Sequence, residues 1–145
     1  MARMVDVSPK PVIRREAVAE GFIKLNRQTI AAIRSGSLEK GDAAEIAKLG
    51  GIAAAKRTPE LLLLCHPIPI ESMDVEVDVL EDGVKVTSYV TATAKTGVEM
   101  EALTAVAVAL LNIWDVTKKL EKDSQGQYPS TALENIHVVK KVKRP

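Results

Sequence analysis

An aspartate and a lysine, Asp115 and Lys118, stand three residues apart in a segment with helical periodicity. At that spacing both side chains lie on one face of a helix and can touch. A carboxylate beside an amine could move protons at a substrate. It could equally be an exposed ion pair that contributes only about a few tenths of a kcal/mol, and the residues alone leave both interpretations open.

A second candidate group is His66, which lies in the segment Leu63-Leu64-Cys65-His66-Pro67-Ile68-Pro69. The prolines fix the backbone there, and an imidazole titrates near neutral pH, so His66 could act as a general acid or base. It could also be an ordinary core histidine. We expect no zinc, because no spacing in the chain supplies four ligands, and we expect Cys65 to be a buried thiol rather than a nucleophile.

Two glutamates, Glu99 and Glu101, stand near the start of the longest helical segment. Thr96 and Glu99 have the spacing of a capping box, which would account for Glu99 without any ligand. Glu101 is not explained by that cap. Since the helix dipole favours any acid in a first turn, Glu101 is either a dipole partner or a site residue.

Cationic side chains are spread over several segments that could converge on an anion, namely Arg15, Lys40, Lys56, Arg57, Lys95 and Lys118. A triphosphate needs such a cluster. The triplet Lys95-Thr96-Gly97 is similar to the end of a phosphate loop but lacks the upstream glycines, so it is a weak signal. The free N–H groups of the helix that begins there could still bind an anion. For Lys56 and Arg57 the alternative is an interaction with the C-terminus of their own helix.

The composition narrows the class of protein. The 145 residues fit one domain, and a hydrophobic content of 46% can build a core. Only 3% are aromatic, so the core must be aliphatic and base-stacking surfaces are scarce. The net charge of +1 attracts neither nucleic acid nor an anionic membrane. The single cysteine excludes an intramolecular disulfide, and no apolar stretch is long enough or suitably flanked for a signal peptide or a membrane span, so we expect a cytoplasmic protein.

The elements that must position these groups follow from periodicity, caps and turns. We predict strands over residues 12–25, 73–80, 84–94 and 133–142, and helices over 26–34, 42–56, 58–64 and 97–120. The glycine pair Gly50-Gly51 inside a helix indicates close approach of another backbone. With residues 42–56 and 58–64 counted as one helical segment, the order is β-α-α-β-β-α-β. This order predicts an α+β fold, with a ferredoxin-like antiparallel sheet covered by helices on one face. Residues 1–10 are expected to form a flexible N-terminal arm, and residues 11–145 a single domain.

The helix predicted over residues 97–120 carries Glu101 and Asp115 on one face, with alanine and valine between them. Such a face is too apolar for open solvent, and we expect another subunit or a ligand to cover it. The two acids are fourteen residues apart, which is about 21 Å at 1.5 Å per residue. If both belong to one site, either the substrate is long or a symmetry-related chain supplies one of them. We favour the second chain, because the small apolar residues suit a subunit contact.

Three segments occur in a characteristic order: Lys40-Gly41-Asp42 leading to Gly51-Ile52-Ala53-Ala54-Ala55-Lys56-Arg57-Thr58, then Leu64-Cys65-His66-Pro67, then Lys95-Thr96-Gly97-Val98-Glu99-Met100-Glu101-Ala102-Leu103-Thr104. Together they resemble the cyclic pyranopterin monophosphate synthase family, the C protein of molybdenum cofactor biosynthesis. Residues 4–8 and 115–118 also resemble that family, so the similarity spans nearly the whole chain. The chain departs from the pattern at Ala94, where glycine is expected, and at its end, Lys143-Arg144-Pro145, which lacks a Gly/Lys-rich tail. These departures affect loop geometry and C-terminal contacts rather than the reaction.

The resemblance implies a ferredoxin-like catalytic domain and a homohexamer, a trimer of dimers with active sites shared between subunits. It implies conversion of (8S)-3′,8-cyclo-7,8-dihydroguanosine 5′-triphosphate, a GTP-derived small molecule, into cyclic pyranopterin monophosphate with release of diphosphate. No cofactor is expected, although a divalent ion could shield the substrate triphosphate. Carried over by position, the catalytic groups are Lys40, His66, Asp115 and Lys118, and the substrate-binding groups are Arg15, Lys56, Arg57, Cys65, Glu99, Met100 and Glu101.

The residue types suit that chemistry. Opening a purine five-membered ring requires proton transfers, and expelling diphosphate requires neutralised charge on the leaving oxygens. On this hypothesis Asp115 and Lys118 move protons at the ring, while Lys40 and the arginines hold the phosphates. Two other classes remain: a ferredoxin-like module that only binds a small anion, and a nucleotide phosphohydrolase, for which the chain lacks the clustered carboxylates of a two-metal site.

Overall fold

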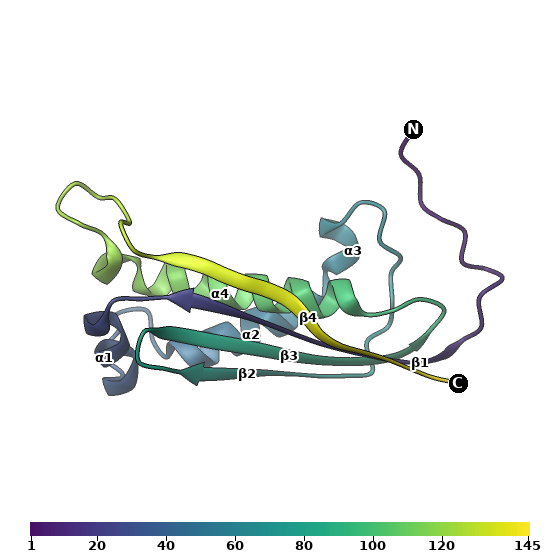
Figure 1. The fold of residues 1–145 in the computed structure, drawn as a ribbon, viewed down its shortest axis with the longest axis horizontal. Helices are drawn as coiled ribbons and strands as arrows, with labels where there is room; N and C mark the ends of the chain where they lie inside the picture. Colours follow the sequence, from purple (N-terminus) through teal and green to yellow (C-terminus); the bar gives the residue numbers. More distant parts are fainter.

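Four antiparallel strands form one open sheet in the order β2-β3-β1-β4 (Figure 1). A computed structural model describes residues 1–145. Its elements are β1 (Ile13–Lys24), α1 (Arg27–Ser35), α2 (Ala43–Lys56), α3 (Thr58–Leu61), β2 (Ser72–Val79), β3 (Gly83–Ala94), α4 (Glu99–Glu121) and β4 (Ala132–Arg144). The predicted α+β, ferredoxin-like fold is confirmed, with α3 as a separate turn of helix in the order β-α-α-α-β-β-α-β. The predicted flexibility of residues 1–10 and the single domain over residues 11–145 stay predictions.

One hairpin forms where alternation and turn residues predict it. The hairpin of β2 and β3 aligns Ser72 with Thr91 and Val79 with Val84, so its register is unbroken. β1 pairs with β3 on one side and with β4 on the other. Strand β4 is one of the two edge strands and is mostly exposed, and two register shifts break its regular pairing with β1.

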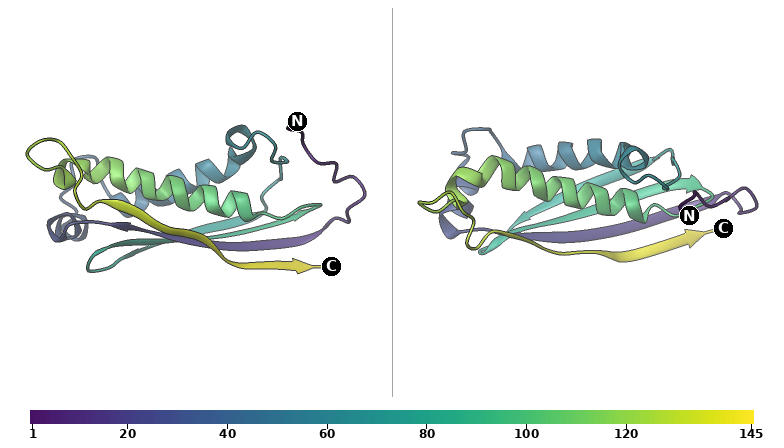
Figure 2. Two further views of the ribbon diagram at one scale, coloured as in Figure 1. Left: turned by 45° about the horizontal axis from the view of Figure 1, so that its top comes forward. Right: turned by 90° about the horizontal axis from the view of Figure 1, so that it is seen from above.

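Helices α2 and α4 lie side by side on one face of the sheet, as both views in Figure 2 show. The core between them and the strands contains 19 buried residues, all of them aliphatic. An aliphatic core was expected from the low aromatic content. By length and composition α4 is long and apolar enough to cross a membrane, contrary to the expectation from the sequence. However, Val106, Leu110 and Ile113 of this helix belong to the core, and 44% of its most apolar 18-residue window is buried in the fold.

The glycine pair of α2 explains how closely the two helices approach. A Cβ added at Gly51 would lie 3.0 Å from the Ala105 carbonyl oxygen, and one added at Gly50 would lie 2.5 Å from Asn112 Nδ2. The predicted backbone approach is therefore confirmed. The same contact corrects the expectation that another subunit or a ligand covers the Ala and Val residues on the outer face of α4. Ala105 on that face is fully buried against α2 of its own chain.

Helix ends follow the sequence signals only in part. Asp42 caps α2 as predicted, since its side chain accepts hydrogen bonds from the N–H groups of Ala44 at 2.9 Å and Glu45 at 3.2 Å. The capping box predicted for Thr96 and Glu99 is wrong. The α4 helix begins at Glu99 with Val98 as its N-cap, and no side chain caps it.

The helix predicted over residues 58–64 is also shorter than expected. It ends at Leu61, and the leucines at positions 61–64 project into solvent, with Leu63 85% exposed. These leucines find no apolar surface of the same chain to pack against, so the amphipathic pattern that predicts a longer helix has no partner.

Candidate functional site

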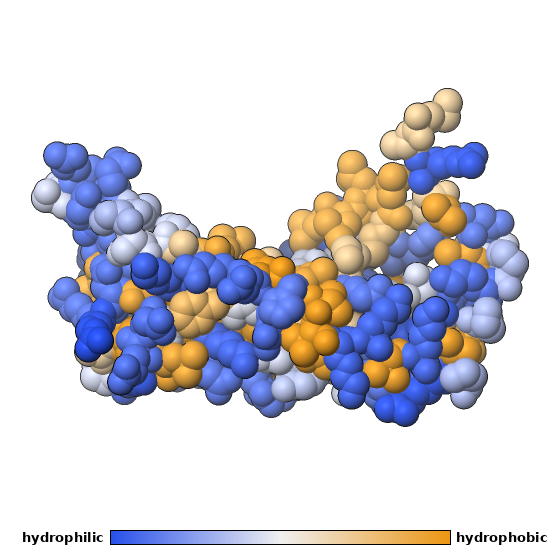
Figure 3. Space-filling model, viewed as in Figure 1, coloured by the Kyte–Doolittle hydropathy of each residue, from blue (hydrophilic) through white to orange (hydrophobic).

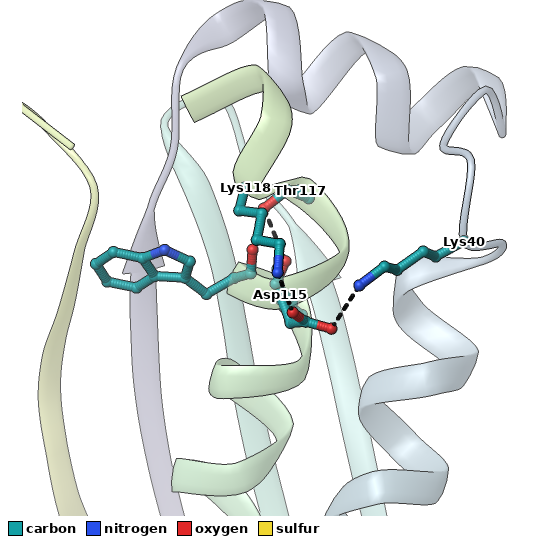
Figure 4. A network of polar contacts seen from close by, with 6 residues as sticks. Lys40, Asp115, Thr117 and Lys118 are labelled. Atoms are coloured by element: carbon teal, nitrogen blue, oxygen red, sulfur yellow. Dashed lines mark hydrogen bonds and ion pairs between the residues drawn. The ribbon is translucent and has the colours of Figure 1, made fainter. Parts of the chain in front are cut away.

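The C-terminal end of α4 carries a cluster of one carboxylate and two amines (Figure 4). Asp115 accepts hydrogen bonds from Lys40 Nζ at 2.9 Å and from Lys118 Nζ at 3.0 Å. We call Lys40, Asp115 and Lys118 the aspartate–lysine cluster. Its two amines come from different elements, since Lys40 precedes α2 and Lys118 lies one turn beyond Asp115 on α4. The structure therefore brings together three of the four predicted catalytic residues.

Local sequence explains why Lys40 reaches α4. Gly36 ends α1 in a left-handed conformation with φ +70°, and Gly41 has φ +116° just before the Asp42 cap. Both values favour glycine, because a Cβ is strained there. The loop between them forms, with α4, a cavity of about 320 Å³ lined by residues 37–40, 115, 116 and 118–120.

The cluster is held in its ionised form. Hydrogen bonds from Lys40 and then Lys118 lower the pKa of Asp115 below its ordinary value. In turn, the hydrogen bond and charge of Asp115 raise the pKa of Lys118. A lysine with a raised pKa keeps its proton at neutral pH, so Lys118 stays charged and suits the role of a phosphate partner. It is a weak acid, and it can give its proton only to a strongly basic atom of the substrate.

A buried carboxylate anchors the same end of the helix. Glu121 is 1% exposed and accepts hydrogen bonds from the Asn26 N–H at 3.0 Å, from Thr131 Oγ1 at 2.6 Å and from the Thr29 hydroxyl. It ties the start of α1 and the segment before β4 to α4. Glu121 is not among the predicted site residues, although an acid in the last turn of a helix is disfavoured by the helix dipole and could have indicated a special role.

The N-terminal end of α4 borders a second cavity of about 660 Å³. Its lining contains the predicted site residues Cys65, His66, Glu99 and Met100, together with residues 61–64, 68, 96 and 97. Figure 3 shows apolar surface rising beside a hollow in the molecule, over the α3 region seen in Figure 1. This end thus combines an apolar wall with a histidine and a glutamate.

Two carboxylates at this end have oxygen atoms without a hydrogen-bond partner. Glu101 is 1% exposed, and neither of its carboxylate oxygens has a partner. Glu99 Oε1 is also without a partner, while Glu99 Oε2 lies 3.3 Å from Lys141 Nζ on β4. Burial raises the pKa of Glu101, the nearby N–H group of its own backbone partly opposes that rise, and the charge of Glu99 adds to it. The Glu101 carboxyl is therefore biased toward its neutral form.

Cys65 and His66 both line this cavity, and Cys65 is half-buried rather than fully buried as predicted. Burial, and secondly the charge of Glu101, raise the pKa of the Cys65 thiol, so it stays protonated and is a poor nucleophile. His66 Nε2 lies 2.7 Å from the carbonyl oxygen of Val5 in the N-terminal arm. That contact and the Lys141–Glu99 pair have no signal in the local sequence, because they join segments far apart in the chain.

The remaining predicted cations join neither cavity. Arg15 is 3% exposed and donates to the carbonyl oxygens of Ala94 at 3.3 Å and Lys95 at 3.1 Å, so it supports the loop between β3 and α4. Lys56 borders a different hollow, with residues 68–73, and Arg57 is exposed beside it. No group of three or more His, Cys, Asp or Glu residues is arranged to hold a metal ion.

The structure thus defines an α+β domain with a ferredoxin-like sheet and one long helix that carries a different polar group at each end. The MoaC family model matches residues 4–143, and the chain belongs to the MoaC family.

Curated relatives are similar over nearly their whole length. A protein of Sulfurisphaera tokodaii, named a probable cyclic pyranopterin monophosphate synthase, is 56% identical over 142 residues, which cover 98% of this chain and 94% of the relative. A protein of the same name from Pyrococcus horikoshii is 55% identical over 141 residues, covering 97% and 89%. One from Methanothermobacter thermautotrophicus, named a probable cyclic pyranopterin monophosphate synthase accessory protein, is 52% identical over 141 residues, covering 97% and 89%.

Proposed function

We propose that this MoaC-family chain is a cyclic pyranopterin monophosphate synthase of molybdenum cofactor biosynthesis. It converts (8S)-3′,8-cyclo-7,8-dihydroguanosine 5′-triphosphate into cyclic pyranopterin monophosphate and diphosphate. The names of its relatives support this reaction. Among the structural features, the aspartate–lysine cluster carries the proposal, because it pairs proton-transfer groups with cations at one cavity.

The roles of the residues follow from their charge states. Lys118, which stays protonated, acts as a general acid toward the ring nitrogen that becomes strongly basic as the ring opens, and Asp115 holds both amines in place. Lys40 and Lys118 neutralise the developing charge on the diphosphate oxygens. A divalent ion bound to the substrate triphosphate would share that task. At the other end of α4, His66 exchanges protons with the purine ring, and Glu101 can offer a proton from its neutral carboxyl.

The active site is completed by a second chain. Asp115 and Glu101 stand fourteen residues apart on one continuous helix, which separates them by about 21 Å along its axis. The exposed leucines of residues 61–64, beside the second cavity, need an apolar cover. A partner subunit that supplies the cover and brings its own aspartate–lysine cluster satisfies both requirements, and we propose a homohexamer built as a trimer of dimers, in the cytoplasm.

Turnover of the cyclised GTP by the purified chain tests the proposal. We expect equal amounts of cyclic pyranopterin monophosphate and diphosphate. A ligand-binding module would bind the substrate and leave it unchanged, and a phosphohydrolase would release phosphate from GTP itself. Either of these outcomes would contradict the proposed function.

A further inference from the structure

The N-terminal arm, residues 4–8, reaches the end of the molecule where α3 and the start of α4 lie (Figures 1 and 2). Two of its backbone carbonyl groups contact side chains there. The Val5 oxygen lies 2.7 Å from His66 Nε2, and the Ser8 oxygen accepts a hydrogen bond from Lys95 Nζ at 3.3 Å. The arm therefore bridges the two segments that precede and follow the β2–β3 hairpin.

The arm has local structure of its own that orients these carbonyls. Asp6 Oδ1 accepts a hydrogen bond from the Ser8 N–H at 2.9 Å, and the Lys10 N–H donates to the Val7 oxygen at 3.0 Å. The hydrogen bond between Asp6 and Ser8 is an Asx turn, which bends the chain between the carbonyl groups of Val5 and Ser8. The position of the Val5 oxygen is thus set by the arm sequence as well as by His66.

A backbone carbonyl has no proton to give, so the contact fixes where the imidazole proton must be. At 2.7 Å the hydrogen bond requires a proton on Nε2. In the neutral ring the basic lone pair is then on Nδ1, which makes no hydrogen bond within the chain. Groups that fix a histidine tautomer through its second nitrogen orient the ring and set which nitrogen can act.

We propose that the Val5 carbonyl is a positioning group that holds neutral His66 in its Nε2–H tautomer and leaves Nδ1 as the nitrogen that exchanges protons. The effect on the ring is independent of any reaction, whereas its effect on turnover rests on the proposed function. Because the group is a backbone carbonyl, substitution of the Val5 side chain cannot remove it, and truncation can.

Nitrogen-15 NMR of histidine-labelled protein measures the tautomer directly, because protonated and unprotonated ring nitrogens have well separated shifts. Three chains are compared: the full chain, a chain that begins at Met4 and so keeps Val5, and a chain that begins at Pro9. We expect the Nε2–H form in the first two and a shift toward a mixture of tautomers in the third. His137 is the internal reference, since its ring contacts Asn135 and Glu20, outside the arm, and its signals should not move.

The full-length variant Asp6→Ala removes the Asx turn. It provides the second test of the proposal if the chain that begins at Pro9 does not fold. It should also weaken the Nε2–H preference. In either altered chain kcat should fall by about 5- to 10-fold, the size of one lost hydrogen bond, with a smaller change in KM. An unchanged His66 tautomer in every folded altered chain would overturn the proposal. A full chain that shows the tautomer but no turnover would instead contradict the proposed function alone.

Discussion

The two ends of α4 treat buried carboxylates in opposite ways. Glu121, at the C-terminal end, receives three hydrogen bonds from other segments of its own chain. Glu101, at the N-terminal end, is equally buried and receives none from a side chain or from another segment. An unpaired buried carboxylate costs free energy. The hydrogen bonding of the buried carboxylate is therefore satisfied within one chain at the first end and is not satisfied at the second.

This difference suggests which part of the proposed active site each chain provides. The aspartate–lysine cluster and its anchor Glu121 are assembled when the monomer folds, so they form a preset half-site. The end that carries Glu99, Glu101 and His66 keeps unpaired acids beside an exposed apolar wall. Such a half-site is suited to meet a substrate and a second subunit, which would repay the cost of burial.

The largest expected effect is on the preset half-site. Lys118→Ala should lower product formation by about 10²- to 10⁴-fold, because it removes the proposed general acid, while folding and assembly stay intact. The matched control is Lys48→Ala, which removes an exposed ion pair with Asp74 at 3.3 Å, away from both cavities, and should leave turnover nearly unchanged. Near-normal turnover of pure Lys118→Ala would refute the catalytic role of the cluster.

The next effect is on the open half-site. His66→Gln should reduce kcat by about 10²-fold, since glutamine cannot exchange protons near neutral pH. Metal content should be the same in both proteins, because His66 belongs to no group of metal ligands. Stoichiometric zinc in the native protein, lost in the variant, would show that this role is wrong.

Stability should separate the two buried glutamates. Glu121→Ala leaves the donors on Asn26, Thr29 and Thr131 without an acceptor, and we expect a loss of about 3 kcal/mol in the free energy of unfolding. Glu101→Ala removes a group without such partners and should cost clearly less. Denaturant unfolding of both variants measures the difference. Equal losses would mean that the contrast between the two ends has no energetic basis.

The smallest effect concerns pH. The pKa of Glu101 is raised in the folded chain, so its neutral form stabilises the fold below the unfolded pKa, and that contribution is lost as pH rises through the folded pKa. Glu101→Gln keeps a neutral group at all pH values. The variant should therefore gain stability relative to the native chain as pH rises from acid to neutral, measured by unfolding at several pH values. A gain on acidification would contradict the sign.

The sequence predicted those features of the fold that depend on residues close together in the chain, and it missed most of those that depend on contacts between distant segments. The β2–β3 hairpin and the Asp42 cap depend on residues close in sequence, and both were predicted correctly. The α3 helix was overestimated, because residues 61–64 have an apolar pattern but no surface to pack on. Strand β4 was found within one or two residues, although its irregular pairing with β1 has no local signal.

For the candidate site, the sequence motifs identified the candidate residues but not which of them lie together at each end of α4. The sequence paired Asp115 with Lys118 through helical spacing, which the 3.0 Å contact confirms. It could not show that Lys40 is the third member of that cluster, or that Ala105 is covered by α2, because both contacts depend on how separate helices pack. The partners of His66 and Glu99 lie in the arm and in β4, too far along the chain for any spacing rule.

The central claim is that one active site combines the N-terminal end of α4 from one chain with the C-terminal end from another. Mixing Glu101→Gln chains with Asp115→Asn chains, after dissociation and reassembly, tests it most directly. Each variant alone should be inactive. In mixed oligomers, some active sites will contain an intact Glu101 from one chain and an intact Asp115 from another, and these sites should restore part of the native turnover. If mixed oligomers form and no activity returns, the two half-sites do not share one active site.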